Sequence, residues 1–211
     1  MLMHYGITRN TQMDGVIQGK FSALVPSKDG KLPSEAAQDE VTLIMLGARS
    51  NHPLGIFAPG YADLEDYMNR MLTQLAENAN EYGYLGYSNW LENNARTNNN
   101  QVMIACYFRT IEDLHAYAHS PLHREAWNWW NSLTKSRPYL AINHEVYQSP
   151  KKHWENIYIN CHPSGINAMV RTEEGWTRPI VDARRGGMRS QTGRMSRSAG
   201  DDNEKYGPEP Y

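Results

Sequence analysis

Apolar residues between positions 41 and 161 follow two different periods. Short runs of strand-forming residues, separated by turn residues, predict β-strands over 41–50, 83–91, 101–109 and 139–148. Residues 61–78 instead place apolar side chains at i, i+3, i+4 and i+7, which predicts an amphipathic helix. The stretch NNARTNNN predicts a hairpin loop, and 154–161 predicts a further extended or mixed segment.

A second helical region follows the strand 101–109. Thr110 with Asp113 three residues later resembles a capping box, which marks a helix start. This helix runs to about Ser120, where Pro121 interrupts it. Because proline is tolerated in the first turn of a helix, a second helix restarts there and continues to about Lys135.

The resulting order, β-α-β-β-α-β, predicts the α+β class. It is the ferredoxin-like arrangement, an antiparallel four-stranded sheet with helices on one face. The strand 101–109 is apolar on both faces, with Ile104 and Cys106 on one and Met103 and Ala105 on the other. Helices on one face leave the second face to be covered by something else. A second copy of the sheet is the simplest candidate, which predicts a homodimer.

The two ends differ from the domain predicted over 41–168. Residues 1–40 show no sustained period, contain the polar stretch PSKDGKLPSEAAQDE, and are interpreted as an N-terminal arm. Residues 169–211 form a C-terminal extension. From about residue 182 it holds five arginines, an acidic end and almost no large apolar residues, which predicts disorder. A solvated terminus is favoured over a basic tail for RNA or anionic lipid, because the acidic end offsets the arginines.

Composition limits the class of protein. The 211 residues are 40% hydrophobic and carry a formal net charge of −2, typical of a soluble globular protein with no electrostatic signature for nucleic acid. No apolar run approaches the ~20 residues that span a bilayer, and MLMHYGITRN lacks the pattern of a signal peptide, so the expected location is cytoplasmic. Cys106 and Cys161 are interpreted as reduced and structural.

Three histidines are concentrated in LHAYAHSPLHREAWNWWN, residues 114–131. His115 and His119 are spaced i, i+4 and share a helix face, so they can ligate a metal together, with His123, His144 or Glu145 as further ligands. The pattern is not HExxH, and no CxxC supports it. Packing and polar roles in a pocket, including a proton shuttle, are therefore favoured over a metal or haem site.

The same stretch is rich in tryptophan. In a regular helix His123, Trp127 and Trp130 share one face, and Trp129 lies on the other. Trp127 and Trp130 suit pocket lining or core packing equally well, whereas core packing is favoured for Trp129.

Charged residues on the predicted strands are the remaining candidates. Arg49 and Arg109 both end strands, where each can bind a carboxylate or phenolate or form a salt bridge at the rim. His144 and Glu145 point to opposite faces of their strand, so one of them should be buried with a partner.

Several of these segments resemble a known family. GYLGYSNWL, YFRTIEDLHAYAHSPLHREAWNWWN, HEVY and HWENIYINCHPSGI resemble a fungal monooxygenase-like family of the dimeric α+β barrel superfamily, related to antibiotic-biosynthesis-type monooxygenases. The likeness covers about 40–168, and one relative is the polyketide-tailoring monooxygenase of the fumagillin pathway. It implies dimerisation through the sheets, a cavity between sheet and helices, and tailoring of a fungal secondary metabolite.

This superfamily also includes haem-dependent aldoxime dehydratases, muconolactone-type isomerases and inert stress proteins, so membership does not fix the reaction. No GxGxxG, P-loop, GxSxG or kinase motif is present, which argues against nucleotide, flavin or NAD binding by the usual motifs. The first hypothesis is a cofactor-independent monooxygenase acting on a hydrophobic polyketide, terpenoid or aromatic intermediate. Alternatives are a non-redox cyclase, isomerase or dehydratase, a haem or metal protein, and a non-catalytic dimeric binding protein.

The first hypothesis assigns roles to the candidate residues. His119 or His123 is the base, and Arg109 or Arg49 stabilises the substrate anion. The catalytic candidates are His119, His123, Arg109 and His144. The substrate-binding candidates are Arg49, Trp90, Tyr107, His115, Trp127, Trp130 and Glu145.

Overall fold

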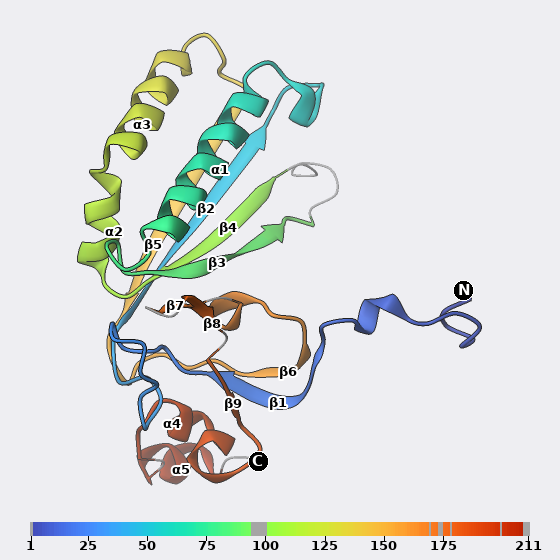
Figure 1. Cartoon of the computed structure of the whole chain (residues 1–211), viewed down its shortest axis with the longest axis vertical. Coiled ribbons are helices and arrows are strands. Elements are labelled where there is room, and N and C mark those ends of the chain that lie inside the picture. The colour runs from blue at the N-terminus through green and yellow to red at the C-terminus, as the bar shows by residue number, and fades with distance from the viewer. Residues whose placement is uncertain are drawn as a thin grey trace.

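An antiparallel four-stranded sheet forms the centre of the protein (Figure 1). The structure is a computed structural model, and it describes residues 2–93, 101–168, 170–172, 175–177, 179–198 and 200–208. Most of the predicted hairpin loop, residues 94–100, lies outside the described residues. The strands of the sheet are β2 (Val41–Ser50), β3 (Tyr84–Leu91), β4 (Val102–Phe108) and β5 (Leu140–Ser149).

The strand order β3-β4-β2-β5 is that of a ferredoxin-like protomer, so the predicted α+β fold is confirmed. The central strand β2 pairs antiparallel with both β4 and β5, which brings Leu46 opposite Ile104 on one side and His144 on the other. Residues directly opposite each other share a face of the sheet. The register therefore places these three side chains together.

Three helices cover one face of this sheet (Figure 1): α1 (Tyr61–Glu77), α2 (Ile111–Ala118) and α3 (Pro121–Leu133). The predicted capping of α2 is confirmed, because the Thr110 hydroxyl accepts a hydrogen bond from the amide of Asp113 at 3.0 Å. The predicted break at Pro121 is also confirmed. Ser120 caps α3 by accepting from the amide of His123 at 3.3 Å.

The main core fills the space between sheet and helices near the C-terminal half of α1. Leu72 and Leu75 pack there with Ile44, Cys106 and Phe108 of the sheet. Cys106 is 1% exposed, and burial raises the pKa of its thiol to about 12. Both cysteines are free. A buried thiol that stays protonated at neutral pH has the structural role predicted for Cys106.

The second face of the sheet is partly covered by the ends of the same chain. β1 (Ile17–Ala23) pairs with β6 (Tyr158–Cys161) and β9 (Ile180–Asp182) in a small sheet of order β6-β1-β9. A second apolar cluster joins this region to the main sheet; it contains Ala23, Val25, Val41, Leu85 and Ile166, with Tyr107, Trp154 and Tyr158 packed against it. The apolar second face therefore has cover from its own chain, which the sequence pattern did not predict.

The segment interpreted as an arm thus contains a strand. Its partners lie more than 130 residues away in the chain, and its second half, Phe21–Ala23, is buried throughout. A short strand buried on both faces shows no alternation of apolar and polar residues, so its period is hidden. The arm before β1 projects from the body of the molecule (Figure 1).

The C-terminal extension begins with the hairpin of β7 (Val170–Thr172) and β8 (Gly175–Thr177). After residue 182, where disorder was expected, it contains the helices α4 (Gln191–Arg194) and α5 (Gly200–Tyr206). The short 3-10 turns of the chain are η1 (Thr11–Met13), η2 (Gly55–Phe57), η3 (Gly165–Asn167) and η4 (Gly186–Arg189).

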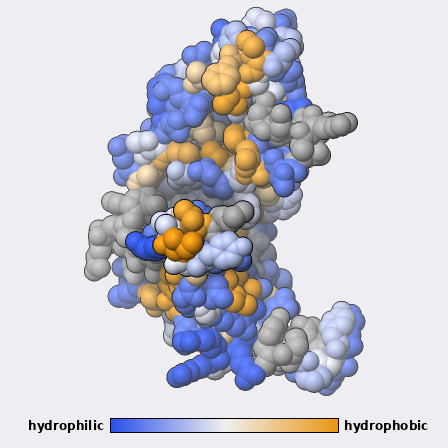
Figure 2. Space-filling view, turned by 90° about the vertical axis from the view of Figure 1, so that its right-hand side faces the viewer, coloured by the Kyte–Doolittle hydropathy of each residue, from blue (hydrophilic) through white to orange (hydrophobic). Residues whose placement is uncertain are grey.

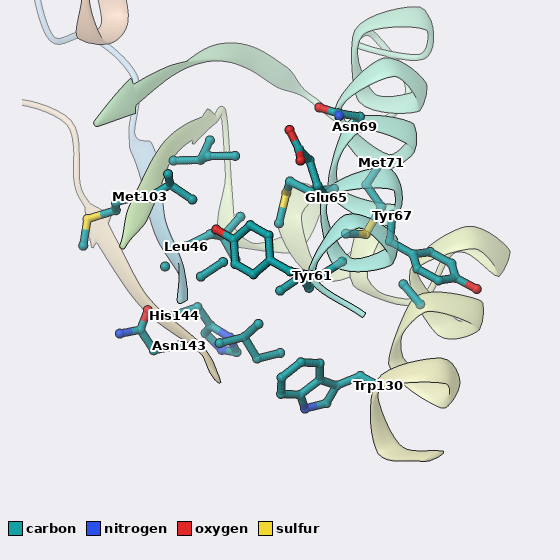
Figure 3. Close-up of a pocket in the computed structure, with 18 of the residues that line it drawn as sticks. Leu46, Tyr61, Glu65, Tyr67, Asn69, Met71, Met103, Trp130, Asn143 and His144 are labelled. Atoms are coloured by element: carbon teal, nitrogen blue, oxygen red, sulfur yellow. The ribbon is translucent and has the colours of Figure 1, made fainter. Parts of the chain in front are cut away.

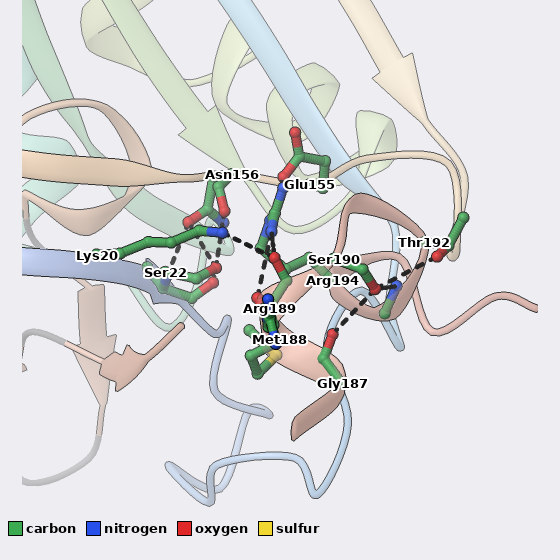
Figure 4. Close-up of polar contacts among 12 residues, drawn as sticks. Lys20, Ser22, Glu155, Asn156, Gly187, Met188, Arg189, Ser190, Thr192 and Arg194 are labelled. Atoms are coloured by element: carbon green, nitrogen blue, oxygen red, sulfur yellow. Dashed lines mark hydrogen bonds and ion pairs between the residues drawn. The ribbon is translucent and has the colours of Figure 1, made fainter. Parts of the chain in front are cut away.

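A buried arginine fastens this extension to the rest of the chain (Figure 4). Arg194 is 3% exposed, and its Nε donates to the carboxylate of Glu155 at 2.6 Å. Its Nη1 donates to the carbonyls of Met188 and Arg189 at 3.2 and 3.1 Å, and Lys20 Nζ also reaches the Arg189 carbonyl, at 2.8 Å. Composition predicts disorder here because it counts Arg194 as a solvated charge, whereas a fully hydrogen-bonded arginine can be buried.

Within the described part of the chain, no helix is both long and apolar enough to cross a membrane.

We predict that Arg194→Met lowers the free energy of unfolding by roughly 2–3 kcal/mol, because it leaves Glu155 without its partner in a largely buried position. Urea unfolding followed by circular dichroism, with trypsin cleavage of residues 184–197 as a local readout, measures the effect. Arg197→Met is the matched control, since Arg197 is exposed and its replacement should change stability by less than about 0.5 kcal/mol. Equal unfolding midpoints for the two variants would show that the buried pair does not fasten the extension.

Candidate active site

A cavity of about 630 Å³ lies between the sheet and the helices α1 and α3 (Figure 3). Its walls are mainly apolar and include Leu46 of β2, Leu64, Met68 and Met71 of α1, and Ile104 of β4. The main core fills the same layer farther along α1, so the cavity is the unfilled part of that layer. A volume of this size suits a small organic molecule.

The helix α3 forms one wall and carries the three tryptophans Trp127, Trp129 and Trp130. None of its residues is fully buried, so α3 covers a hollow and does not seal a packed core. Its contact with α1 is made by the rings of Tyr67 and Trp129, 4.8 Å apart, and by Glu125, which accepts hydrogen bonds from Tyr67 and Arg70 at 3.2 Å each. Trp129 lines the cavity as well, although its spacing favoured core packing.

His123 is a half-buried histidine of α3 that lines the cavity. Burial lowers its pKa from the ordinary value, and the nearby histidines His144 and His119 lower it further. A hydrogen bond to the carbonyl of Ala118 acts in the opposite direction and is weaker than the effect of burial. The ring is therefore neutral at pH 7, and if its N–H faces Ala118 the other ring nitrogen is unprotonated and free to accept a proton.

His144 reaches the same cavity from the opposite wall. It lies on β5, across from Leu46, so it points to the helix-covered face. Glu145 points to the second face, where it accepts a hydrogen bond from the hydroxyl of Tyr147, and it does not line the cavity. The predicted alternation of these two residues is therefore observed, with His144 as the one that faces the cavity. Both side chains are exposed, so the expectation that one of them would be buried with a partner is wrong.

The other two histidines of the motif lie outside the cavity. His115 and His119 are exposed, and Nδ1 of His119 lies 2.7 Å from the carbonyl of His115. Across the described ranges, no three His, Cys, Asp or Glu side chains form a group that could hold a metal ion. His115 and His119 thus lie one helical turn apart, but no third ligand among the described residues lies close enough to complete a metal site with them.

Neither predicted arginine lines the cavity. Arg109 donates to the carbonyls of Pro26 and Ser27 (3.2 Å to Ser27), and its partial burial lowers its pKa. It therefore fastens the segment after β1 to the sheet. Arg49 is on the second-face side of β2, and Tyr107 packs in the second apolar cluster. Both arginines were expected to meet a cleft at a strand end, but Arg109 contacts the segment after β1.

Trp90, Trp127 and Trp130 line the cavity. Trp90 is 54% exposed, and its Nε1 donates to the hydroxyl of Ser88 at 3.0 Å. Trp127 is 51% exposed. These partly exposed rings, with Ile56 and Leu91, make the rim of the cavity apolar. Apolar surface in the upper half of the molecule, broken by polar side chains, is visible in Figure 2.

Four polar residues that line the cavity were not among the site residues predicted from the sequence. Tyr61, Glu65 and Asn69 line it from α1, and Asn89 lines it from β3. In Figure 3 the three α1 side chains project toward the strands, whereas Tyr67 points the other way, toward α3. Burial and the charge of Glu65 raise the pKa of Tyr61, so its hydroxyl remains a hydrogen-bond donor. The spacing 61, 65, 69 on one helix face is the signal that could have identified them.

A known protein family and a fungal protein are similar in sequence to this chain. The sequence model of the family described as Monooxygenase af470-like matches residues 41–166, more than half of the chain. Monooxygenase af470 of Aspergillus fumigatus is 31% identical over 195 residues, which are 89% of this chain and 70% of that protein.

Two solved structures are similar to about half of the length of this chain. SnoaB, a cofactor-independent oxygenase from Streptomyces nogalater, is 15% identical with a TM-score of 0.32, covering 52% of this chain and 91% of SnoaB. Rv0793 from Mycobacterium tuberculosis is 11% identical with a TM-score of 0.35, covering 50% of this chain and 92% of Rv0793. From the family match and the fungal relative, the chain belongs to the Monooxygenase af470-like family.

Proposed function

We propose that this protein is a cofactor-independent monooxygenase that tailors a hydrophobic polyketide, terpenoid or aromatic intermediate of fungal secondary metabolism. The observation that carries the proposal is the neutral, half-buried imidazole of His123, which lines an apolar cavity together with His144. Membership of a monooxygenase family supports the class of reaction. The apolar, tryptophan-rich lining supports the class of substrate.

The proposed reaction begins with removal of a proton by the unprotonated nitrogen of His123. The C–H bond concerned must be acidified by an adjacent carbonyl or aromatic ring, because an imidazole is a weak base. The carbanion transfers an electron to O₂, and recombination forms a C–O bond in a hydroperoxide anion. The protonated His123 returns its proton to the peroxide, and loss of water together with a second hydrogen of the same carbon leaves a carbonyl there. The reacting carbon must therefore carry two hydrogens, and O₂ supplies one oxygen atom to the product and one to water.

The carbanion needs stabilisation, which the sequence analysis assigned to Arg49 or Arg109. Since neither lines the cavity, the proposal gives this role to His144, whose ring can donate an N–H toward the substrate. The tryptophans Trp127 and Trp130 hold a flat or extended apolar molecule against the sheet. A substrate held against these rings would displace water from the cavity, which would strengthen the hydrogen bond from His144.

The proposed homodimer forms through the second face of the sheet. The two copies meet at the part of this face that the ends of the chain leave open. Met45 and Glu145 face each other there across β2 and β5, and the nearby Tyr147 is half exposed. A second copy that buried these side chains would remove apolar surface from water.

We predict that His123→Ala lowers the rate of oxygen uptake about 100-fold or more, because the general base is lost. The assay uses an oxygen electrode and the intermediate that accumulates in a strain lacking this protein. His115→Ala is the matched control and should keep the full rate, since His115 lies outside the cavity. Unchanged turnover in the strict absence of oxygen would exclude the oxygenase and favour a non-redox isomerisation, cyclisation or dehydration.

We also predict the pH dependence of kcat/KM. The pKa of His123 is lowered, so the neutral base persists as pH falls below the ordinary histidine value of about 6.5. The rate should therefore be constant above this pH and decline with a midpoint below it. His144→Gln removes one of the causes that lower the pKa of His123, so the midpoint should move to higher pH. A midpoint above the ordinary value in the unaltered protein would contradict the role of His123 as the base.

For the dimer, we predict a mass of two chains by light scattering after gel filtration, and a mass of one chain for Met45→Glu, which places a charge on the open face. Leu32→Glu is the control, because Leu32 is an exposed apolar residue in the segment before β2. A single-chain mass for the unaltered protein at micromolar concentration would disprove this part of the proposal.

A further inference from the structure

Glu65 and Asn69 line the cavity at the end away from His144, whereas Asn143 lies beside His144 (Figure 3). Glu65 and Asn69 lie in one half of Figure 3, and His144 and Trp130 lie in the other. Asn89 of β3 lines the cavity together with them. Tyr61 and Asn69 are separated by two helical turns, about 12 Å along the axis of α1. Glu65 and Asn69 therefore lie near one end of the cavity, and the imidazole of His144 lies near the other.

These three side chains have no hydrogen-bonding or ionic partner among the described residues. In the part of the chain that the structure describes, none of Glu65, Asn69 and Asn89 makes a hydrogen bond or ion pair to another residue. Cavity-lining groups with unused hydrogen-bonding capacity are available to a bound molecule.

The contrast with neighbouring carboxylates on α1 points to Glu65 in particular. Asp63 is paired with Arg137 at 3.4 Å, and Asp66 with Arg70 at 3.9 Å. Glu65 lies between them in the sequence, points into the cavity, and has no cation among the described residues. Its charge is felt by Tyr61, whose pKa it raises. Glu65 is thus a carboxylate of α1 that faces the cavity without an ion pair to the described residues.

We propose that Glu65, Asn69 and Asn89 form a head-group subsite for a hydrogen-bond-donating group, a hydroxyl or an amine, at one end of an elongated apolar substrate. A carboxylate only accepts hydrogen bonds, and an amide both donates and accepts them. The three side chains can therefore bind a group that donates hydrogen bonds, and the carboxylate of Glu65 repels an ionised acid. The reacting carbon then lies at the other end, beside His123. The position of the reacting carbon rests on the proposed function, whereas the head-group preference does not.

Ligand binding tests the subsite without any turnover. The neutral dye N-phenyl-1-naphthylamine is bound in the cavity and displaced by 1-decanol, decylamine or decanoate, which share one chain length and differ in the head group. For the unaltered protein we expect decanol and decylamine to displace the dye at about fivefold or more lower concentration than decanoate. The order of decanol and decylamine identifies which of the two donors the subsite prefers.

Two variants decide whether Glu65 is responsible. Glu65→Gln should remove most of the discrimination against decanoate, while dye binding and the circular dichroism spectrum stay unchanged because the residue is exposed. Asp66→Asn is the matched control, a carboxylate removed from the next position of the same helix, and it should keep the original ranking. Asn69→Leu should weaken decanol binding and leave dye binding intact.

Decanoate binding as well as decylamine in the unaltered protein would overturn the subsite, and so would an unchanged ranking in Glu65→Gln. Failure of the oxygenase proposal gives a different pattern. In that case the head-group ranking and its loss in Glu65→Gln are observed, but no oxygen is consumed.

Discussion

The packing of α1 against the sheet at only one of its ends determines where the candidate site lies. Leu72 and Leu75, in the C-terminal half of the helix, are buried against Ile44, Cys106 and Phe108. Toward the N-terminus the same layer is incompletely filled, and Leu64 and Met68 line a cavity. Because protein interiors are otherwise packed to high density, an unfilled volume of this size must be maintained by a rigid frame. The well-packed half of α1 supplies that frame.

The interruption at Pro121 contributes the second wall. A continuous helix over residues 111–133 would keep a single direction, whereas the break lets α2 pack into the core through Leu114 and Tyr117 while α3 covers the cavity. Tyr117 fixes the junction, since its hydroxyl donates to the carbonyl of Met71 at 3.0 Å and its ring lies against His123. The position of His123 is therefore tied to the core through one aromatic residue.

Much of the central domain could be predicted because its signals are local. The bounds of β2 were predicted to the residue, and the capping by Thr110 and the break at Pro121 follow from short-range chemistry. β1 could not be predicted in this way. It is specified by partners distant in the chain, such as Asn156, whose side chain exchanges two hydrogen bonds with the backbone of Ala23.

The candidate site was predicted less completely, for a related reason. Residue type and spacing identified His123, His144 and the tryptophans, but they could not show which strand end faces which part of the chain. Arg109 therefore looked available to an anion, whereas it binds carbonyls of the segment after β1. Glu65 looked like any solvated helix residue, because only the arginine partners of Asp63 and Asp66 reveal that it lacks one. Whether a side chain already has a hydrogen-bonding or ionic partner in the folded chain separates the functional candidates from the structural ones better than residue type does.

The central strands lie between the candidate site on one face of the sheet and the ends of the chain on the other. Successive residues of β2 alternate between the cavity, at Leu46, and the second face, at Met45. On that second face the small sheet, fastened by stacked Phe21 and Tyr158 rings and by Arg194, covers the part nearest Val41 and Leu85. Farther along the same face, Met45 is partly exposed, and Glu145 and Tyr147 are exposed. If a second copy covers them, it restrains the backbone that carries Leu46 and His144, so association and the geometry of the site depend on the same strands.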